Sequence, residues 1–409
     1  MKFADQQNIL TMKYHKVSIY FILIIIFSSC SANKQEGISE SNSFKKFDIT
    51  EIDSLYKLSN EKILEIKSYI VLETNEDCII GSFDKLIVKN DKFYVMDRKR
   101  SHKIFVFSNS GQFISSISGE GGGPGEYSFL QDFDVDDQGN IHILDSRAPK
   151  VIVLDSHGQL LKENRFNFFP ESFSLIKDET YLFNSRDRGD EDSGLNYNLI
   201  FWSFSDGIIK TEFKNREILD SPSFIRFSLS SLSKTENKPV LFHQAFSNDF
   251  YSIENDELKL AYRFDFGEKN MNLELLDQRK NGIENTELLT ASGEGGQFFR
   301  YFDSNHYFTT MFIINNQPHY FVYDKLKDKY WIRKHWYMSK ELPFGYWPYA
   351  CDGTDLYGII STDNIQLIKS DNFSEDDQLL IEQSGLEFIK SLEDYSNPVI
   401  VKYSYTFID

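Results

Sequence analysis

Two stretches of the chain repeat each other: FDKLIVKNDKFYVMDRKRSHKIFVFSNSGQFISSIS at residues 83–118 and QDFDVDDQGNIHILDSRAPKVIVLDSHGQLLKENR at residues 131–165. They align with a single one-residue gap, and the alignment matches Gly111 with Gly158. The period is about 48 residues, and each copy consists of short β-rich runs separated by Asn, Asp, Ser and Gly. A repeat of this length that holds four antiparallel strands is typical of one blade of a β-propeller.

The two copies predict the strands of blades one and two, at 85–88, 93–96, 104–107 and 113–117, and at 133–135, 141–144, 151–154 and 160–162. The later blades are more degenerate. Blade three runs from 173 through 181–183 to 199–203; blade four has 225–229, 240–244, 249–253 and 260–264; blade five has 307–313, 320–323 and 331–336; blade six has 349–351 and 356–360, with 366–369 following. An acidic insertion, 187–193, interrupts blade three, and the segment 270–281 favours helix and is expected outside the ring. The expected fold is therefore all-β, a six-bladed propeller of four-stranded antiparallel blades.

The two ends of the chain are expected to close the ring. Residues 376–392 have the pattern of amphipathic helical turns, and the strand 399–407 follows them. A lone terminal strand needs a partner, because an unpaired strand edge invites aggregation. We expect the segment 69–72 to pair with 399–405, so that N-terminal and C-terminal strands complete one blade.

The N-terminus has the pattern of a lipoprotein export signal. Lys13 and Lys16 precede the apolar run 19–27, which is too short to span a bilayer and fits the apolar region of a signal peptide. Two serines then precede Cys30, as in a bacterial lipobox, although Phe27 stands where an aliphatic residue is usual. The sequence predicts a signal peptide at 1–29, lipid attachment at Cys30, a flexible tether at 30–46 and a propeller domain at 47–409; a short N-terminal anchor or a buried strand is the alternative.

The charge of the chain excludes some partners. Removal of residues 1–29 takes away three of the 44 basic residues and one of the 62 acidic residues, which leaves 41 and 61 and a formal charge of −20. Such an acidic surface argues against nucleic acid and against anionic lipid headgroups, so membrane association would come from the lipid anchor. The two remaining cysteines, Cys78 and Cys351, form no disulfide framework; buried free thiols are favoured, and a disulfide between them stays open.

Four stretches together resemble a known family: GEGGGPGEY at 119–127, the pattern VF-x-x-x-G-x-F-x-x-x-I at 106–117, LETNEDCIIGSFDKL at 72–86 and EDYSNPVIVKYSY at 393–405. The chain is similar in these to the six-bladed β-propeller lipoproteins of Bacteroidetes, which are related in shape to NHL-repeat and TolB-like propellers. The resemblance implies a lipid-anchored protein of the cell envelope, in the outer or the inner membrane. It implies no set of catalytic residues.

Several motifs favour structural roles over cofactor or metal binding. The glycine run 119–125 lacks the lysine and the strand-to-helix context of a phosphate loop, so we expect a crossover between blades. The Asp134-x-Asp136 segment lacks the spaced ligands of a calcium loop and predicts a β-turn. The histidines show no zinc-binding spacing, and no Gly-x-Ser-x-Gly elbow is present. The sequence therefore predicts no cofactor, no metal site and no local catalytic motif.

A recurring arginine is the candidate binding feature. Asp97-Arg98, Asp145-Ser146-Arg147 and Asn184-Ser185-Arg186 follow the second strand of the first three blades, on the face that also carries the glycine run. The full set of candidate ligand-binding residues is Arg98, Arg147, Arg186, Arg226, Arg300 and Trp347, the last three lying among aromatic residues. Arginines beside aromatic rings suit carboxylates or sugars. In the alternative interpretation, each arginine pairs with the neighbouring aspartate and holds adjacent blades together.

The expected function is a binding or scaffold module in the cell envelope, for an extracytoplasmic glycan, peptide or protein partner. A lyase or hydrolase that acts on a sugar polymer at the channel mouth is the alternative, and it requires converging carboxylates, or a His with a Tyr or Arg. A purely structural subunit of an envelope complex is the third hypothesis, and it would expose a broad apolar patch.

Overall fold

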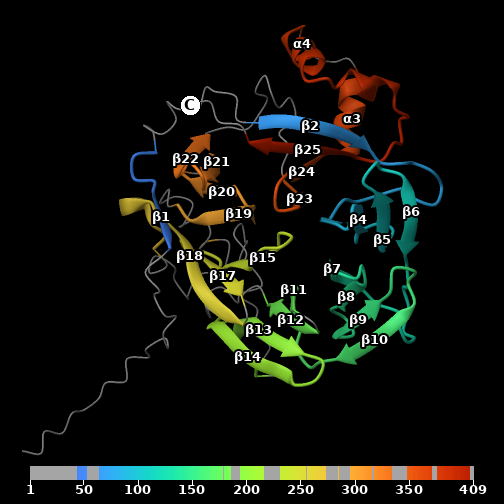
Figure 1. Ribbon diagram of the computed structural model, residues 1–409, viewed down its shortest axis with the longest axis vertical. Helices are drawn as coiled ribbons and strands as arrows, with labels where there is room; N and C mark the ends of the chain where they lie inside the picture. The colour runs from blue at the N-terminus through green and yellow to red at the C-terminus, as the bar shows by residue number, and fades with distance from the viewer. Residues whose placement is uncertain are drawn as a thin grey trace, which may run out of the picture. The chain divides into compact units, whose positions relative to one another are not determined.

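The computed structural model describes residues 44–52, 64–177, 179–185, 194–215, 231–254, 256–272, 284, 295–315, 317–333, 348–370 and 375–405. These residues form six β-sheets, five of four strands and one of five, arranged around a ring as the blades of a propeller (Figure 1). The first strand of each blade contacts the first strand of the next all the way around. The predicted fold class, a six-bladed β-propeller of four-stranded antiparallel blades, is confirmed.

The four strands of each of blades one to five run in sequence order from the channel outward, whereas the outermost strand of blade six comes from the N-terminal part of the chain. Blade one is β3 (Lys85–Lys89), β4 (Lys92–Asp97), β5 (Lys103–Ser108) and β6 (Phe113–Ile117). Blade two is β7 (Leu130–Val135), β8 (Ile141–Asp145), β9 (Lys150–Leu154) and β10 (Leu160–Arg165). Blade three is β11 (Ser172–Lys177), β12 (Thr180–Asn184), β13 (Tyr197–Ser203) and β14 (Gly207–Lys214). Blade four is β15 (Ser231–Ser233), β16 (Val240–His243), β17 (Asp249–Glu254) and β18 (Glu257–Asp265), with β1 (Lys45–Asp48) outside it. Blade five is β19 (Gln297–Asp303), β20 (Tyr307–Ile314), β21 (Gln317–Asp324) and β22 (Lys329–Arg333), and blade six is β23 (Ala350–Cys351), β24 (Leu356–Ile360), β25 (Val399–Tyr405) and β2 (Leu64–Val71).

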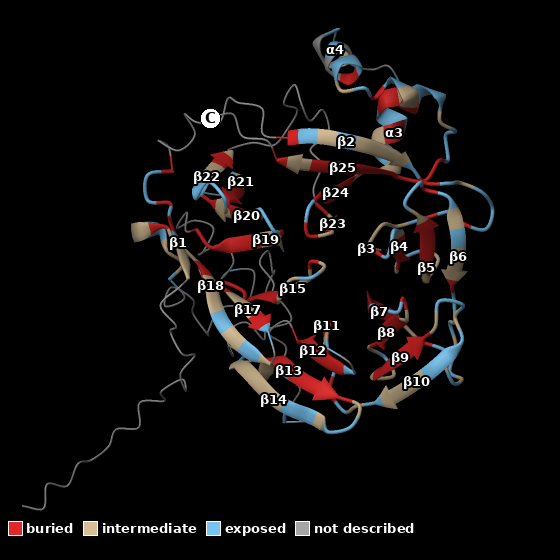
Figure 2. Ribbon diagram, viewed as in Figure 1, coloured by how far each residue is buried: buried red, intermediate tan, exposed pale blue. Residues whose placement is uncertain are grey.

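The core lies between the blades, where apolar side chains of adjacent sheets meet. The middle strands β8 and β9 are buried along their whole length, whereas the outer strand β10 is largely exposed (Figure 2). The turn glycines of the repeat have the left-handed backbone that their positions require, with φ of +86° at Gly111 and +80° at Gly158. A Cβ atom on Gly111 would lie 2.2 Å from the Val71 carbonyl oxygen, so no larger residue fits at this turn.

Strands from both ends of the chain close the ring, as the sequence predicts. β2 pairs antiparallel with β25, and Tyr69 lies opposite Val401 in this register. β1 adds a parallel strand to β18, and Phe47 packs there against Phe264 and Phe321. Strand β1 begins at Lys45, slightly before the predicted start of the propeller domain.

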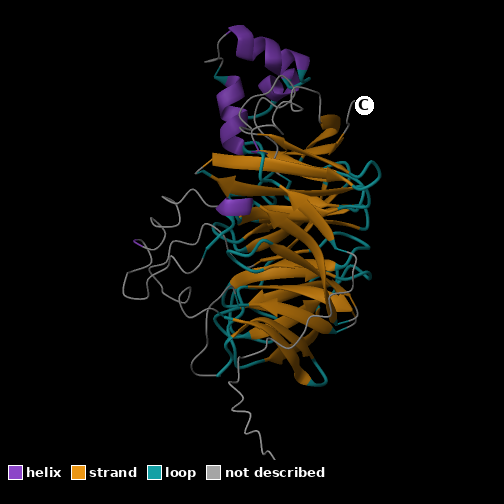
Figure 3. Ribbon diagram, turned by 90° about the vertical axis from the view of Figure 1, so that its left-hand side faces the viewer, coloured by secondary structure: helices purple, strands orange, loops and turns teal. Residues whose placement is uncertain are grey.

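A helical insertion between β24 and β25 lies at one edge of blade six (Figures 1 and 3). It contains α3 (Thr362–Lys369), α4 (Glu375–Gln383) and the 3₁₀ helix η5 (Glu387–Ser391), which confirms the helical turns predicted at 376–392. Residues 366–369, which were expected to follow the strands of blade six, belong to α3 instead. Ser361 caps the start of this helix, since its hydroxyl accepts a hydrogen bond from the Asn364 N–H. No helix among the described residues is both long and apolar enough to cross a membrane.

The degenerate blades differ from the sequence prediction in detail. The outer strand of blade three, β14, and the inner strand of blade five, β19, were not predicted. β22 begins at Lys329, slightly before the predicted start at 331, and the predicted residues 334–336 lie outside the described residues. The inner strand of blade four is β15, whereas the predicted strand 225–229 lies outside the described residues, as do the insertion 187–193 and most of 270–281. The outer strand β14 borders solvent on one side, so its hydrophobic pattern is weaker than that of the middle strand β13, and in β19 a bulge at Arg300 and Tyr301 interrupts the alternation.

Candidate functional site

The inner strands of all six blades surround a central channel with a volume of about 360 Å³. This volume falls within the range of about 300–1,000 Å³ that is usual for ligand pockets. The wall combines charged residues with serine hydroxyls and aromatic rings. Its polar lining comprises Asp84, Lys85, Lys89, Asp132, Asp134, Ser172, Ser174, Ser231, Ser233, Lys234, Glu236, Arg300 and Tyr349.

Two aspartates of β7 hold the channel wall together. An inner strand has an unpaired edge, and its N–H and C=O groups need partners. Asp132 accepts from the Phe173 N–H at 3.0 Å, and Asp134 accepts from the Leu175 N–H at 2.8 Å, so both bond the open edge of β11. Lysine Nζ atoms donate to the carbonyl oxygens of the matching edge of β7, from Lys85 to Phe133 and from Lys89 to Val135.

Ion pairs accompany these backbone bonds. The Lys85 Nζ atom lies 2.7 Å from an Asp132 carboxylate oxygen. Lys234 directly follows β15, and its Nζ atom lies 2.7 Å from an Asp134 carboxylate oxygen. Burial alone would raise the pKa of Asp134, but the two ammonium groups and the Leu175 N–H outweigh it and hold that pKa below its usual range. The Asp134 carboxylate is therefore ionised, and both aspartates link blade two to its neighbours through these bonds.

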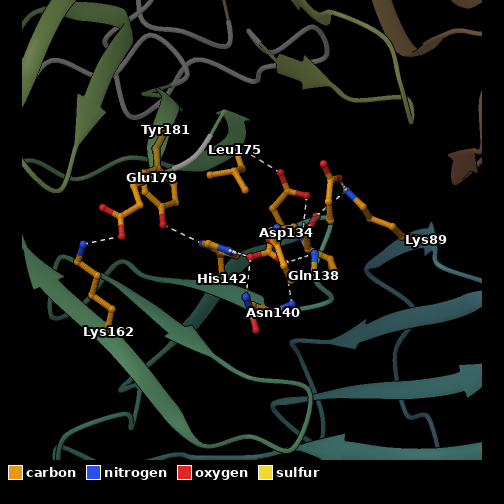
Figure 4. Close-up of polar contacts among 12 residues, drawn as sticks. Lys89, Asp134, Gln138, Asn140, His142, Lys162, Leu175, Glu179 and Tyr181 are labelled. Carbon is orange, nitrogen blue, oxygen red and sulfur yellow. Dashed lines mark hydrogen bonds and ion pairs between the residues drawn. The ribbon is translucent and has the colours of Figure 1, made fainter.

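A buried polar chain links blade two to blade three beside the channel (Figure 4). The His142 Nδ1 atom lies 2.8 Å from the Tyr181 hydroxyl, and its Nε2 atom lies 3.3 Å from an Asp136 oxygen. Burial lowers the pKa of His142, and the nearby carboxylates offset only part of this effect. His142 and Tyr181 are 4% and 0% exposed, so neither reaches a ligand in the channel.

Asp136 itself occupies the turn that the sequence predicts. Its carboxylate accepts from the backbone N–H groups of Gln138 and Asn140 at 2.9 and 2.8 Å. Within the described part of the chain, no three His, Cys, Asp or Glu side chains gather closely enough to hold a metal ion. Cys78 and Cys351 are both buried free thiols, and burial raises the pKa of Cys351 to about 12.

Glu236 lies where the channel meets a second cavity of about 350 Å³, which the turns 136–138 and 234–239 border. Burial raises the pKa of Glu236, and the nearby acids Asp352, Asp137 and Asp91 raise it further, whereas Lys89 lowers it. A carboxyl group of this kind at a channel mouth can exchange a proton closer to neutral pH than an ordinary glutamate.

The glycine run forms the crossover between β6 and β7, as predicted. Three of its N–H groups are already bonded: Gly123 donates to Glu126 at 2.7 Å, Gly125 donates to Glu163 at 3.0 Å, and Gly121 donates to the Tyr127 carbonyl oxygen at 2.9 Å. A phosphate would have to displace these carboxylates, so the structure agrees with a role in linking blades.

The aspartates of the Asp-Arg pattern bond backbone groups instead of the neighbouring arginines. Asp97 accepts from the Gly81 N–H at 2.8 Å and from the Arg100 N–H at 3.0 Å. Asp145 accepts from the Ser128 N–H at 2.6 Å and from the Arg147 N–H at 2.9 Å. Each aspartate thus ties its own turn to the preceding crossover, which is why the repeat has an acid at this position.

The structure describes three of the six candidate residues, Arg98, Arg147 and Arg300. Arg98 donates to the Gln131 carbonyl oxygen at 3.4 Å, and exposed Arg147 lies over the Phe129 ring at 5.3 Å. Neither lines the channel, whereas Arg300 does. The remaining candidates, Arg186, Arg226 and Trp347, lie outside the described residues.

Arg300 is the predicted residue that the structure places in the channel. It is exposed, and its guanidinium carbon lies 4.1 Å from the centre of the Tyr349 ring. The other charged residues of the channel were not predicted from the sequence. The alternation Asp132-x-Asp134 within β7 could have indicated them. Charges at every second position of a buried strand indicate that one of its faces meets polar groups.

The chain belongs to the family described as a domain of unknown function, DUF4934, whose model matches residues 44–404. No curated protein sequence matches it. Among solved structures, a predicted exported protein of Bacteroides fragilis is similar, with 18% identity, 89% of this chain and 100% of that chain covered, and a TM-score of 0.71. A DUF4221 family member of Bacteroides vulgatus has 11% identity over 85% and 99% of the two chains, with a TM-score of 0.49. Virginiamycin B lyase from Staphylococcus aureus has 11% identity over 72% and 81%, with a TM-score of 0.39.

Proposed function

We propose that this protein is an extracytoplasmic binding module, anchored to the cell envelope through a lipid on Cys30, whose ligand enters the central channel. The observation that carries the proposal is the channel itself, in which six inner strands converge around a cavity of ligand size whose wall is both polar and apolar. Export is supported by the apolar run 19–27 before Cys30. The similarity in fold to a predicted exported protein agrees with it.

The chemistry of the wall favours binding over catalysis. Asp132 and Asp134 are engaged by lysines and by backbone N–H groups, and the low pKa of Asp134 makes it a poor general acid. A wall whose charged groups are already paired supports recognition, because fewer of its side chains have to rearrange when a ligand binds. The candidate ligands are a glycan, a peptide or a segment of an envelope protein.

Glu236 supports a second candidate function. Its raised pKa at the channel mouth is what a lyase or hydrolase acting on a sugar polymer would require of its acid or base. Turnover that Glu236→Gln abolishes, with binding unchanged, would establish the enzyme in place of the binding module.

The test is a binding screen of the mature chain against glycans and envelope extracts, with released products assayed in parallel. The Ser172→Phe variant places a ring in the channel wall, and Ser110→Phe adds the same ring to an exposed outer turn as a control. We expect saturable binding without products, which Ser172→Phe weakens at least about tenfold and Ser110→Phe leaves unchanged. Binding that both variants retain would refute the channel as the site, and a Cys30→Ala chain that stays in the membrane fraction would refute the lipid anchor.

A further inference from the structure

We propose that Arg300 is an anion-recognition residue and that the channel binds an acidic saccharide through the carboxylate of that ligand. The inference rests on the proposed function, in which the channel is the binding site. It adds the chemical class of the ligand and the residue that selects it. The backbone, the stacking and the ion pairing of Arg300 each support it.

The backbone at Arg300 is a bulge that redirects the side chain. The pairing of β19 with β20 shifts between Phe299 and Phe302, so Arg300 and Tyr301 lie outside the regular register. Arg300 has a φ of +37°, a conformation that costs an L-residue with a long side chain free energy. Bulges and residues with positive φ concentrate where a side chain must be aimed at a functional site.

Neighbouring side chains hold this bulge in place. The Tyr301 ring is 2% exposed, and its hydroxyl donates to the Ser231 carbonyl oxygen and accepts from the Ser231 hydroxyl. The bulge is thus anchored to blade four while Arg300 remains exposed in the channel. The surrounding structure therefore maintains a conformation that the local sequence disfavours.

Stacking orients the guanidinium group. Arg300 lies over the Tyr349 ring at 4.1 Å, and Phe83 meets Tyr349 edge-on, with ring centres 5.3 Å apart. A guanidinium group that rests on a ring keeps its N–H donors available. Two parallel N–H groups match the two oxygens of a carboxylate.

The ion pairing in the channel distinguishes Arg300 from the lysines of the wall. Lys85, Lys89 and Lys234 each pair with an aspartate at 2.6 or 2.7 Å. None of the ion pairs among the described residues involves Arg300. In a chain of net charge −18, a fixed cation in a cavity with no described carboxylate partner is suited to a negatively charged ligand.

The wall favours a saccharide over an extended peptide. A peptide that adds as a strand needs free N–H and C=O groups on a sheet edge. The edge groups of β7 and β11 are already bonded to lysine and aspartate side chains. Serine hydroxyls line the channel instead. Sugar hydroxyls can pair with such groups.

The experiment uses an array of oligosaccharides that contain uronic or sialic acids, each beside its carboxyl-reduced counterpart. We expect the mature chain to bind at least one acidic member, and to bind the reduced counterpart at least about tenfold more weakly. Arg300→Gln should show the same loss, and Arg147→Gln, which removes an exposed arginine stacked on a ring outside the channel, should bind as wild type does.

Arg300→Gly separates binding from folding. Glycine adopts a φ of +37° without strain, so this variant should unfold at the same urea concentration as wild type while binding at least about tenfold more weakly. If Arg300→Gly loses stability and keeps its binding, Arg300 is structural and the inference is wrong.

The remaining outcomes are also decisive. Binding that Ser172→Phe abolishes but that neither carboxyl reduction nor Arg300→Gln affects would overturn the inference and leave the proposed function standing. Capture of a peptide with a free C-terminal carboxylate, and not of its amide, would overturn the saccharide as the ligand class. An array without any bound acidic member would do the same.

Discussion

Replacing Asn397 by alanine would remove the side chain that joins the end of the helical insertion to the crossover between blades six and one. Asn397 is 1% exposed, and its Nδ2 atom donates to the carbonyl oxygens of Glu73 and Cys78, both at 2.7 Å. Its Oδ1 atom accepts from the Ile80 N–H at 2.8 Å. Alanine makes none of these bonds, and the Cys78 and Ile80 groups are left without these partners inside the protein.

The magnitude follows from the number of bonds. A neutral hydrogen bond contributes about 1 kcal/mol net, and a buried group without a partner costs about 1–3 kcal/mol. The three lost bonds predict a decrease of about 3 kcal/mol in the free energy of unfolding. The Glu73 carbonyl oxygen keeps one partner, because it also accepts from the Cys78 thiol. Asn397→Asp should cost more than alanine, because it replaces two donors by an anion that faces two carbonyl oxygens.

Equilibrium unfolding in urea measures the effect. Asn75→Ala is the matched control: Asn75 lies in the same crossover, but it is exposed and its bonds to Glu73 and Asp77 lie in solvent. We expect this control to lose less than about 1 kcal/mol. The reasoning is refuted if the two alanine variants differ by less than about 1 kcal/mol, or if Asn397→Asp is the more stable of the two Asn397 variants.

Two further predictions concern the repeat and the buried histidine. Gly111→Ala should lower the free energy of unfolding by at least about 3 kcal/mol, since the new Cβ atom would meet the Val71 carbonyl oxygen. Gly207→Ala is the control and should cost about 1 kcal/mol, because Gly207 has a φ of +69° but no atom close to the added Cβ. Equal losses in urea unfolding would contradict the steric argument. The pKa of His142 lies below the ordinary 6.5 because burial disfavours the imidazolium. As the pH falls, the unfolded chain therefore binds a proton at this histidine before the folded chain does. The contribution of neutral His142 to the free energy of unfolding should be fully present above about pH 6.5 and decline below it. Urea midpoints between about pH 7.5 and 5.5 should fall more steeply for wild type than for His142→Gln, and parallel curves would show that His142 does not control this range.

The sequence predicts the architecture well because the features that define a blade are local and periodic. Alternating apolar residues and turn glycines recur in both copies, and Gly111 and Gly158 have the backbone conformation that their place in the repeat implies. The pairing of 69–72 with 399–405 was also predictable, because a terminal strand without a partner is unfavourable. Blade five was less accurate, since its inner strand β19 has a bulge at Arg300 and Tyr301 that interrupts the alternation of its apolar residues.

The candidate site was predicted only in part. The Asp-Arg pattern suggested a binding face or an interblade ion pair, but Asp97 and Asp145 bond backbone N–H groups of crossovers that precede them by many residues. Arg300 was a candidate binding residue because its neighbours in the sequence are aromatic. The ring that orients it is Tyr349, in another blade.

By itself, the sequence determined the number and kind of blades, the positions of the sharp turns and the strands that close the ring, because hydrophobic periodicity and backbone preference act over a few residues. Only the tertiary structure decided which charges became structural and which remained available to a ligand. Lys85, Lys234 and Arg300 are all cations of inner strands or their ends, and their local sequences do not show which of them pairs with a carboxylate. Lys85 pairs with Asp132 of the next blade, Lys234 pairs with Asp134 of blade two, and Arg300 stacks on the Tyr349 ring in the channel. That difference depends on contacts between residues far apart in the chain, which form only when the ring closes.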